Sequence, residues 1–136
     1  MRSKKQDIIL HSLLAVGLFL LDRVTKYYST LFCVRPCFIN QFLSFQVTFN
    51  RGISWGMFHT ESVLPFVIIS LMIMITTIGI GWIAYHRYQR GKCIVGELLV
   101  IAGSVSNSVD RVFYAGVIDF IQLSYHEWTW PVFNIA

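Results

Sequence analysis

The sequence feature that most constrains the fold is a stretch of twenty-five residues, between Glu61 and Arg87, that contains no Lys, Arg, Asp or Glu. Within this stretch, residues 63–85 are almost wholly apolar. A hydrophobic segment of about 20 residues is long enough to cross the hydrocarbon core of a bilayer as a helix. We therefore expect a membrane-spanning helix over residues 63–85.

Two further membrane-spanning helices are expected, at about residues 8–28 and 94–114. The first begins with a charge-free run over residues 8–21 that follows a basic N-terminus, as in a secretory leader. No small-residue cleavage site follows this run, so we interpret it as a retained helix. The third is polar near both of its ends, and polar groups inside a span are functional candidates.

The basic residues predict the orientation of these helices. Six of the eleven Lys and Arg residues lie before the first span or between the second and third, in short segments that the positive-inside rule places in the cytoplasm. Because orientation explains these residues, the net charge of +4 does not indicate a nucleic-acid partner. The charged fraction is 13%, against about 25% in soluble domains, which argues against a water-soluble globular protein.

The segment between the first two spans, about residues 38–60, is predicted to lie outside the membrane and to contribute to a β platform. Residues 43–50, LSFQVTFN, alternate strictly between apolar and polar, which is the period of a half-buried strand. The expected apolar face consists of Leu43, Phe45, Val47 and Phe49, and the expected polar face of Ser44, Gln46, Thr48 and Asn50. A turn is expected at residues 50–52 and a second extended segment at 117–125. The fold class is therefore an all-α membrane bundle with a small extracytoplasmic β platform, in one integral-membrane domain over residues 1–136.

The polar residues of the third span share one helix face. Asn107, Asp110 and Arg111 follow Gly103 at offsets of four, seven and eight residues. Gly103 would let a neighbouring helix approach closely, so that the polar side chains point into the protein rather than into lipid. The alternative is a structural cluster in which Asp110 and Arg111 neutralise each other and lock the helices together.

Two further carboxylates stand out. Asp22 lies four residues before Lys26, on the same helix face, and the alternative for this pair is an interfacial position from which the long side chain snorkels. Asp119 differs because its neighbours in residues 115–121 are apolar and no cation is close in sequence. Such surroundings raise the pKa of a carboxyl group by desolvation, which suits acid–base catalysis near neutral pH. The alternative for Asp119 is an ordinary position at the end of a strand.

The sequence predicts no metal and no cofactor. The four His residues are dispersed and match no metal-site or catalytic-triad spacing, and no nucleophile-elbow or phosphate-loop motif is present. Cys33 and Cys37 fall on the expected outer side, where a disulfide could form. Cys93 is expected to face the cytoplasm and to stay reduced.

Five sequence blocks, in order over nearly the whole chain, resemble the bacterial lipoprotein signal peptidases, also called signal peptidase II. The blocks are LDRVTK at 21–26, FNRGISWG at 49–56, AGSVSNSVDR at 102–111, GVIDFI at 116–121 and FNIA at 133–136. The resemblance implies a four-helix inner-membrane aspartic endopeptidase with its active face outside and its N-terminus in the cytoplasm. It implies cleavage of diacylglyceryl-modified prolipoproteins just before the lipidated Cys.

The resemblance also implies roles for individual residues. Asp119 matches the first catalytic aspartate. The positions that match the supporting residues are Asn107, Asp110, Arg111, Asn50, Gly52, Asp22, Lys26 and Asn134. The implied partners are the prolipoprotein signal peptide with its diacylglyceryl-Cys, membrane lipids and globomycin-type inhibitors, and we expect a monomer.

The resemblance departs from the family pattern after Ala136. The family's last block continues with an Asp, which is the second catalytic carboxylate and opens a fourth helix. Paired carboxylates supply one base and one acid, so we hypothesise a C-terminal truncation that leaves residues 1–136 inactive until the Asp and the helix are restored. Two alternatives stay open: a non-catalytic three-span scaffold that binds lipidated peptides, and a small transporter that uses Asp110 and Arg111.

Overall fold

The computed structural model describes residues 4–53 and 57–136. Residues 1–3, with part of the basic N-terminus, and residues 54–56, at the end of the second sequence block, lie outside the described residues. The elements follow one another as α1 (Lys4–Phe32), β1 (Cys37–Phe38), β2 (Leu43–Asn50), α2 (Val63–Gln89), α3 (Val95–Tyr114), β3 (Val117–Tyr125) and β4 (Trp128–Thr129).

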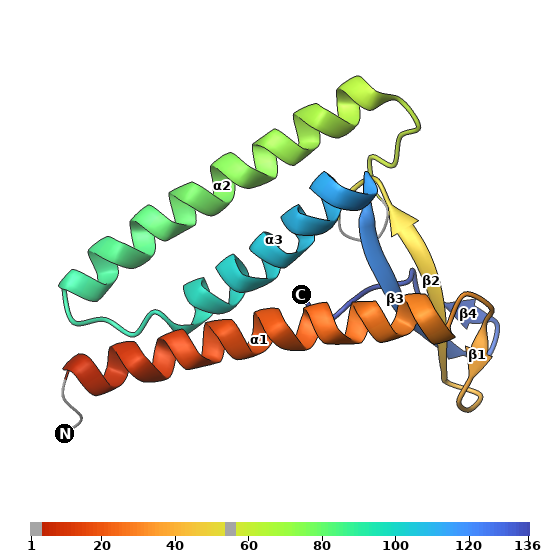
Figure 1. Cartoon of the computed structure of the whole chain (residues 1–136), viewed down its shortest axis with the longest axis horizontal. Coiled ribbons are helices and arrows are strands. Elements are labelled where there is room, and N and C mark those ends of the chain that lie inside the picture. Colours follow the sequence, from red (N-terminus) through yellow and green to blue (C-terminus); the bar gives the residue numbers. More distant parts are fainter. Residues whose placement is uncertain (1–3, 54–56) are drawn as a thin grey trace.

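The helices form one layer, with α3 between α1 and α2, and an antiparallel sheet closes one end of that layer (Figure 1). The sheet has the strand order β1-β2-β3-β4. The N-terminus of α1 and the α2–α3 connection lie together at the other end (Figure 1). The segment after β4 runs back from the sheet toward the helices, so the last residues of the chain lie beside α3.

Among the described residues, α1 and α2 are the helices long and apolar enough to cross a membrane. Their apolar side chains lie on the outside of the molecule, since only 6% of the most apolar 18-residue segment of each helix is buried. Hydroxyl groups in α2 are satisfied locally, because Ser70, Thr76 and Thr77 each donate to the carbonyl four residues earlier. The surface of these two helices is therefore suited to lipid.

The helix bounds refine the expected spans. α1 extends to Phe32, beyond the expected end at residue 28, because the charges in its second half are paired within the protein and do not interrupt the helix. α3 closely matches the bounds of the expected third span, but it carries Glu97, Asp110 and Arg111 and is not one of the two described helices apolar enough to cross a membrane. The helix ends at Tyr114, and the residue after it, Ala115, takes up the left-handed conformation with φ of 53°. Left-handed backbone ends many helices, and it turns this chain sharply into β3.

The sequence pattern suggests that Gly103 lets a neighbouring helix approach closely, but the structure differs. A Cβ atom at this position would lie 2.8 Å from the backbone carbonyl carbon of Ala136. The close approach therefore belongs to the last described residue of the chain, which packs against the middle of α3. This contact brings the C-terminal segment beside the polar face of α3.

The two long strands confirm the expected extended segments, and β3 has the bounds that the sequence predicts. Their register is irregular: Phe45 pairs with Ile121 and Thr48 pairs with Asp119. β2 therefore holds one more residue than β3 between these two pairs, which is a β-bulge.

The bulge overturns the expected single polar face of β2. Opposite residues in a ladder share a face, and the faces alternate along β3. Thr48 and Asn50 therefore lie on the face of Asp119, whereas Ser44, which pairs with Gln122, lies on the opposite face. An extra residue shifts the alternation by one, and this shift turns the polar end of β2 toward Asp119.

Candidate active site

A buried ion cluster joins α1 to α3. Lys26, on α1, is fully buried, and its Nζ lies 2.6 Å from Asp22 Oδ2 and 2.8 Å from Asp110 Oδ2. The same ammonium group donates to Asn107 Oδ1 over 2.7 Å. An ammonium group has three donors, and each of them has a partner here.

The cluster is balanced in charge and extends to the start of β3. Arg23 Nη1 contacts the other oxygen of Asp110, so two cations face two carboxylates. The backbone N–H of Ile118 also donates to Asp110, over 3.2 Å. Ser106 donates to Asp22 over 2.6 Å. The cluster thus ties α1 and α3 to the residue directly before Asp119.

The alternatives for these charges have different outcomes. The interfacial position expected for Asp22 and Lys26 is wrong, because both are fully buried against α3. A structural cluster that locks helices together is confirmed for Asp110, but its partners are Lys26 and Arg23 on α1 and not Arg111. Sequence reasoning missed Arg23; its place directly after Asp22 in the first block was the available signal.

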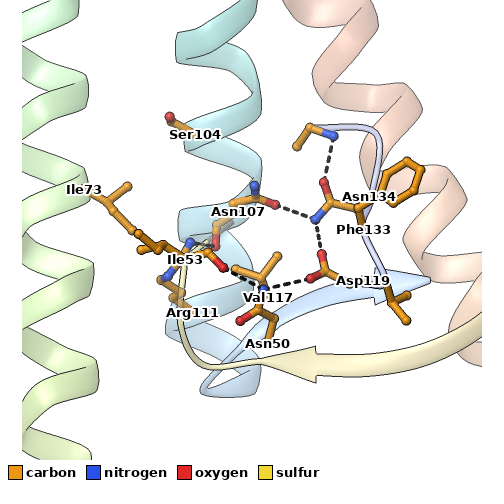
Figure 2. Close-up of a pocket in the computed structure, with 12 residues that line it drawn as sticks. Asn50, Ile53, Ile73, Ser104, Asn107, Arg111, Val117, Asp119, Phe133 and Asn134 are labelled. Atoms are coloured by element: carbon orange, nitrogen blue, oxygen red, sulfur yellow. Dashed lines mark hydrogen bonds between the residues drawn. The ribbon is translucent and has the colours of Figure 1, made fainter. Parts of the chain in front are cut away.

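Asp119 lies on β3 with 5% of its surface exposed. Asn134 Nδ2 donates to its Oδ1 over 2.6 Å, and Asn50 Nδ2 donates to its Oδ2 over 3.0 Å. Figure 2 shows the carboxylate between these two amides, one from the segment after β4 and one from the end of β2. The structure thus brings together three residues that the sequence blocks place far apart.

Asn107 connects the ion cluster to Asp119. Its Oδ1 accepts from Lys26 and also from Asn134 Nδ2, over 3.1 Å. Asn134 Nδ2 is the atom that contacts Asp119, so a continuous path of polar contacts runs from the buried ammonium group to the carboxylate. Figure 2 shows the part of this path from Asn107 through Asn134 to Asp119.

Arg111 supports the other side of the site. Its Nη2 donates to the carbonyl of Gly52 over 3.0 Å, and the N–H of Gly52 donates to Asn50 Oδ1 over 2.9 Å. The expected turn at residues 50–52 is thus held in place from α3. A Cβ atom on Gly52 would lie 2.2 Å from the carbonyl oxygen of Met57, so only glycine fits.

These side chains line a cavity of about 420 Å³. Its walls come from β2, β3, α2, α3 and the C-terminal segment (Figure 2). Of the nine site residues that the sequence predicts, five line it: Asn50, Asn107, Arg111, Asp119 and Asn134. The other four do not line the cavity: Gly52, Asp22, Lys26 and Asp110. Ala136 also lines the cavity.

Burial raises the pKa of Asp119 above the ordinary value for an aspartate. The donors Asn50 and Asn134, and then the charges of Lys26 and Arg111, act in the opposite direction. The predicted direction of the shift and its cause, desolvation, are both confirmed. A carboxyl group with these properties beside a cavity can act as an acid or a base near neutral pH.

The cysteines remain thiols: Cys33, Cys37 and Cys93 are free. Burial and the neighbouring Cys37 raise the pKa of the Cys33 thiol. Within the residues that the structure describes, no three His, Cys, Asp or Glu side chains are grouped as metal ligands. The polar side chains that line the cavity supply a carboxylate, amides, a hydroxyl and a guanidinium group.

A family model described as signal peptidase (SPase) II matches residues 14–136. The lipoprotein signal peptidase of Methylobacterium radiotolerans is 34% identical over 130 residues, which cover 91% of this chain and 75% of that protein. The lipoprotein signal peptidase of Wigglesworthia glossinidia brevipalpis is 32% identical over 132 residues, which cover 92% of this chain and 82% of that protein.

Two solved structures have a similar fold, and both are described as bacterial membrane enzymes solved by the in meso method. The structure at 2.3 Å resolution has a TM-score of 0.71 and 28% sequence identity, with 94% of this chain and 78% of that chain covered. The structure at 1.9 Å resolution has a TM-score of 0.69 and 27% identity, with 94% and 83% covered.

Proposed function

This chain belongs to the signal peptidase II family, and we propose that Asp119 is a catalytic carboxylate of its active site. The family consists of aspartic proteases, and the chain's function is the removal of signal peptides from prolipoproteins. It is a membrane protein, in agreement with the apolar surfaces of α1 and α2.

The observation that carries the proposal is the position of Asp119. It is the carboxylate that lines the 420 Å³ cavity, where a peptide backbone and a water molecule can approach it. Paired-carboxylate hydrolysis needs one ionised carboxylate to take a proton from water and one carboxylic acid to protonate the scissile carbonyl oxygen. Ala136 lines the same cavity, which supports the resemblance's expectation of a second catalytic Asp at the next position.

The other residues of the site hold Asp119 and shape the cavity. Asn50 and Asn134 bind its two oxygens. Arg111 supports Gly52, and Gly52 supports Asn50. The cluster of Asp22, Lys26 and Asp110 fixes α1 against α3, and Asn107 links it to Asn134.

The substrate is a prolipoprotein with a diacylglyceryl-modified Cys, cut just before that residue. The sheet lies at one end of the helices and carries exposed aromatic side chains, among them Trp128 and Trp130. Aromatic rings of this kind favour the membrane interface, which supports a site on the outer face of the inner membrane. A monomer fits the proposal, since the cavity is formed within one chain, and globomycin-type inhibitors would occupy it.

The test is cleavage of a diacylglyceryl-Cys prolipoprotein peptide by protein reconstituted in liposomes, followed by mass spectrometry. Two forms are compared: residues 1–136, and the same residues continued by Asp and an apolar helix. In any form that cleaves, Asp119→Asn should lower kcat by at least ~10²- to 10⁴-fold, because the general base is lost.

Asp7→Asn is the matched control, because Asp7 lies in the first turn of α1, at the end of the helices away from the sheet. This variant should cleave at the rate of the unmodified protein. The proposal is contradicted if Asp119→Asn retains that rate, or if both folded forms leave the peptide intact, as a scaffold or a transporter would.

A further inference from the structure

Two cysteines lie where α1 ends and the sheet begins. Cys33 directly follows α1, and Cys37 is the first residue of β1. The chain bends at residues 34 and 35, between the two cysteines, and so leaves the line of the helix. Neither cysteine lines the cavity beside Asp119, and the proposed hydrolysis uses neither of them.

Both cysteines are attached to β2, at positions two residues apart. The carbonyl of Cys33 accepts from the backbone N–H of Val47 over 3.1 Å, and Cys37 is the ladder partner of Phe45. If the register of β1 and β2 continued without a break, Arg35 would lie opposite Val47. Cys33 contacts Val47 instead, so the bend accommodates two extra residues and brings the cysteines closer than four residues of extended chain would.

This spacing is suited to a disulfide. Two residues of a strand span roughly 6.4–6.8 Å, and less where the strand is strongly twisted, as at a bulge. A disulfide usually joins Cα atoms about 4.4–6.8 Å apart. Burial raises the pKa of the Cys33 thiol, and the charge of Cys37 raises it further. An electrostatic effect weakens with distance, so the two sulfur atoms lie near each other.

The two attachments bracket the β-bulge of β2. The irregular segment runs from Phe45 to Thr48. Cys37 pairs with the first residue of this segment, and Cys33 holds Val47 within it. A covalent bond between the two cysteines would therefore fix the bulged segment to the end of α1.

We propose that Cys33 and Cys37 form a redox-active dithiol, which thiol–disulfide exchange converts into a disulfide that pins the bulge of β2 to the end of α1. The structure describes the reduced form, in which both residues are thiols. The inference goes beyond the proposed function and does not depend on cleavage. The oxidant is a small molecule or a protein that carries a reactive disulfide, and such oxidants act outside the cytoplasm, where the sheet is expected to lie.

The exchange takes place in two steps. Cys37 is exposed and Cys33 is half-buried, so Cys37 reacts first. Its thiol loses a proton, and the thiolate attacks one sulfur of the donor disulfide, whose S–S bond breaks and releases the other sulfur as a thiolate. Cys33 then loses its proton and attacks the sulfur of Cys37, which releases the remaining donor sulfur. Two protein thiols are oxidised to one disulfide, and the donor disulfide is reduced to two thiols.

The test uses the unmodified chain, purified in detergent micelles, in a buffer with equal concentrations of reduced and oxidised glutathione. N-Ethylmaleimide under denaturing conditions then blocks the remaining thiols, and mass spectrometry counts the adducts. The chain has three cysteines, so the fully reduced protein should carry three adducts and the oxidised protein one. The peptide that contains both Cys33 and Cys37 should then carry no adduct and should have lost two hydrogens.

Cys93 is the internal control. It is exposed as well, but it lies in the α2–α3 connection, at the end of the helices away from the sheet (Figure 1). It should keep its adduct in the unmodified chain. The variant Cys93→Ser should lose both of its adducts in the same buffer, whereas Cys37→Ser should form no disulfide within the chain.

Amide hydrogen exchange, measured by NMR in micelles, tests the effect on the bulge. The Val47 N–H should exchange more slowly in the oxidised protein, because the disulfide holds its acceptor, the Cys33 carbonyl, in place. The N–H of Trp130 donates to the carbonyl of Leu123, outside the bulge, and should exchange at the same rate in both forms.

Three adducts after oxidation, separate mixed disulfides of Cys33 and Cys37 with glutathione, or a disulfide between two chains would overturn the proposed dithiol. An unchanged exchange rate at Val47 in a protein that does form the disulfide would overturn its effect on the bulge. Failure of the cleavage assay, by contrast, would refute the proposed function and would leave both measurements interpretable.

Discussion

Lys26 on α1 and Asp110 on α3 form a fully buried ion pair with 2.8 Å between Nζ and Oδ2. Neither helix could bury its charge alone. Each helix is therefore stable only when it is packed against the other. Asp110 also accepts a hydrogen bond from the backbone N–H of Ile118, which fixes the position of the residue before Asp119.

Lys26→Met should destabilise the fold by about 3–5 kcal/mol, because two buried carboxylates lose their shared cation. Arg87→Met is the control: it breaks the pair with Glu97 at a position where Arg87 is 48% exposed. An exposed pair contributes at most about 1 kcal/mol. Denaturant unfolding in mixed micelles, followed by Trp fluorescence, measures both, and equal losses would contradict the prediction.

The pH dependence of cleavage should reflect the raised pKa of Asp119. The base must be ionised, so kcat/KM should increase as the pH rises through a value above the ordinary ~3.9 of aspartate. Stopped assays over a range of pH give this acidic limb. Asp7→Asn should leave the limb in place, and a limb at or below the ordinary aspartate value would count against a buried base.

Gly103→Ala should displace the C-terminal segment, because the new Cβ would meet the Ala136 backbone at 2.8 Å. Asn134 lies on this segment, so its contact with Asp119 should weaken. A misplacement of about 1 Å can lower a catalytic rate ~10²-fold.

Gly96→Ala is the matched control on the same helix, since a Cβ there meets nothing within 4 Å. Alanine favours helix over glycine by about 0.5–1 kcal/mol, so this variant should be slightly more stable and should keep its rate. Equal cleavage rates for the two variants would show that the Gly103 contact does not support the site.

The proposed topology can be tested with two exposed cysteines at opposite ends of the molecule. Cys37 is the first residue of β1, in the sheet, and Cys93 lies in the α2–α3 connection. In single-cysteine variants in intact spheroplasts, a membrane-impermeant maleimide should label Cys37 at once and Cys93 only after permeabilisation. Cys33 is less suitable, because burial raises the pKa of its thiol. The reverse pattern would refute an outer position for the sheet.

Local patterns in the sequence determined much of this protein. The long apolar stretches predict α1 and α2, because a membrane-spanning helix depends on a run of apolar residues and little else. The apolar neighbours of Asp119 in the sequence predict a buried strand, and burial is what raises the pKa of this carboxyl group. The bounds of β3 were also predictable, because they depend on the residues of the strand itself.

Only the tertiary structure decided which polar groups meet. The sequence suggests that Asp110 pairs with its neighbour Arg111, but helix geometry turns Asp110 toward Lys26 and leaves Arg111 to hold Gly52. The bulge in β2 turns Asn50 toward Asp119. Residues 43–50 alternate strictly between apolar and polar, and this pattern gives no indication that a bulge is present. The partners of a buried charge are set by packing between distant segments, whereas helices and spans are set by residues close in sequence.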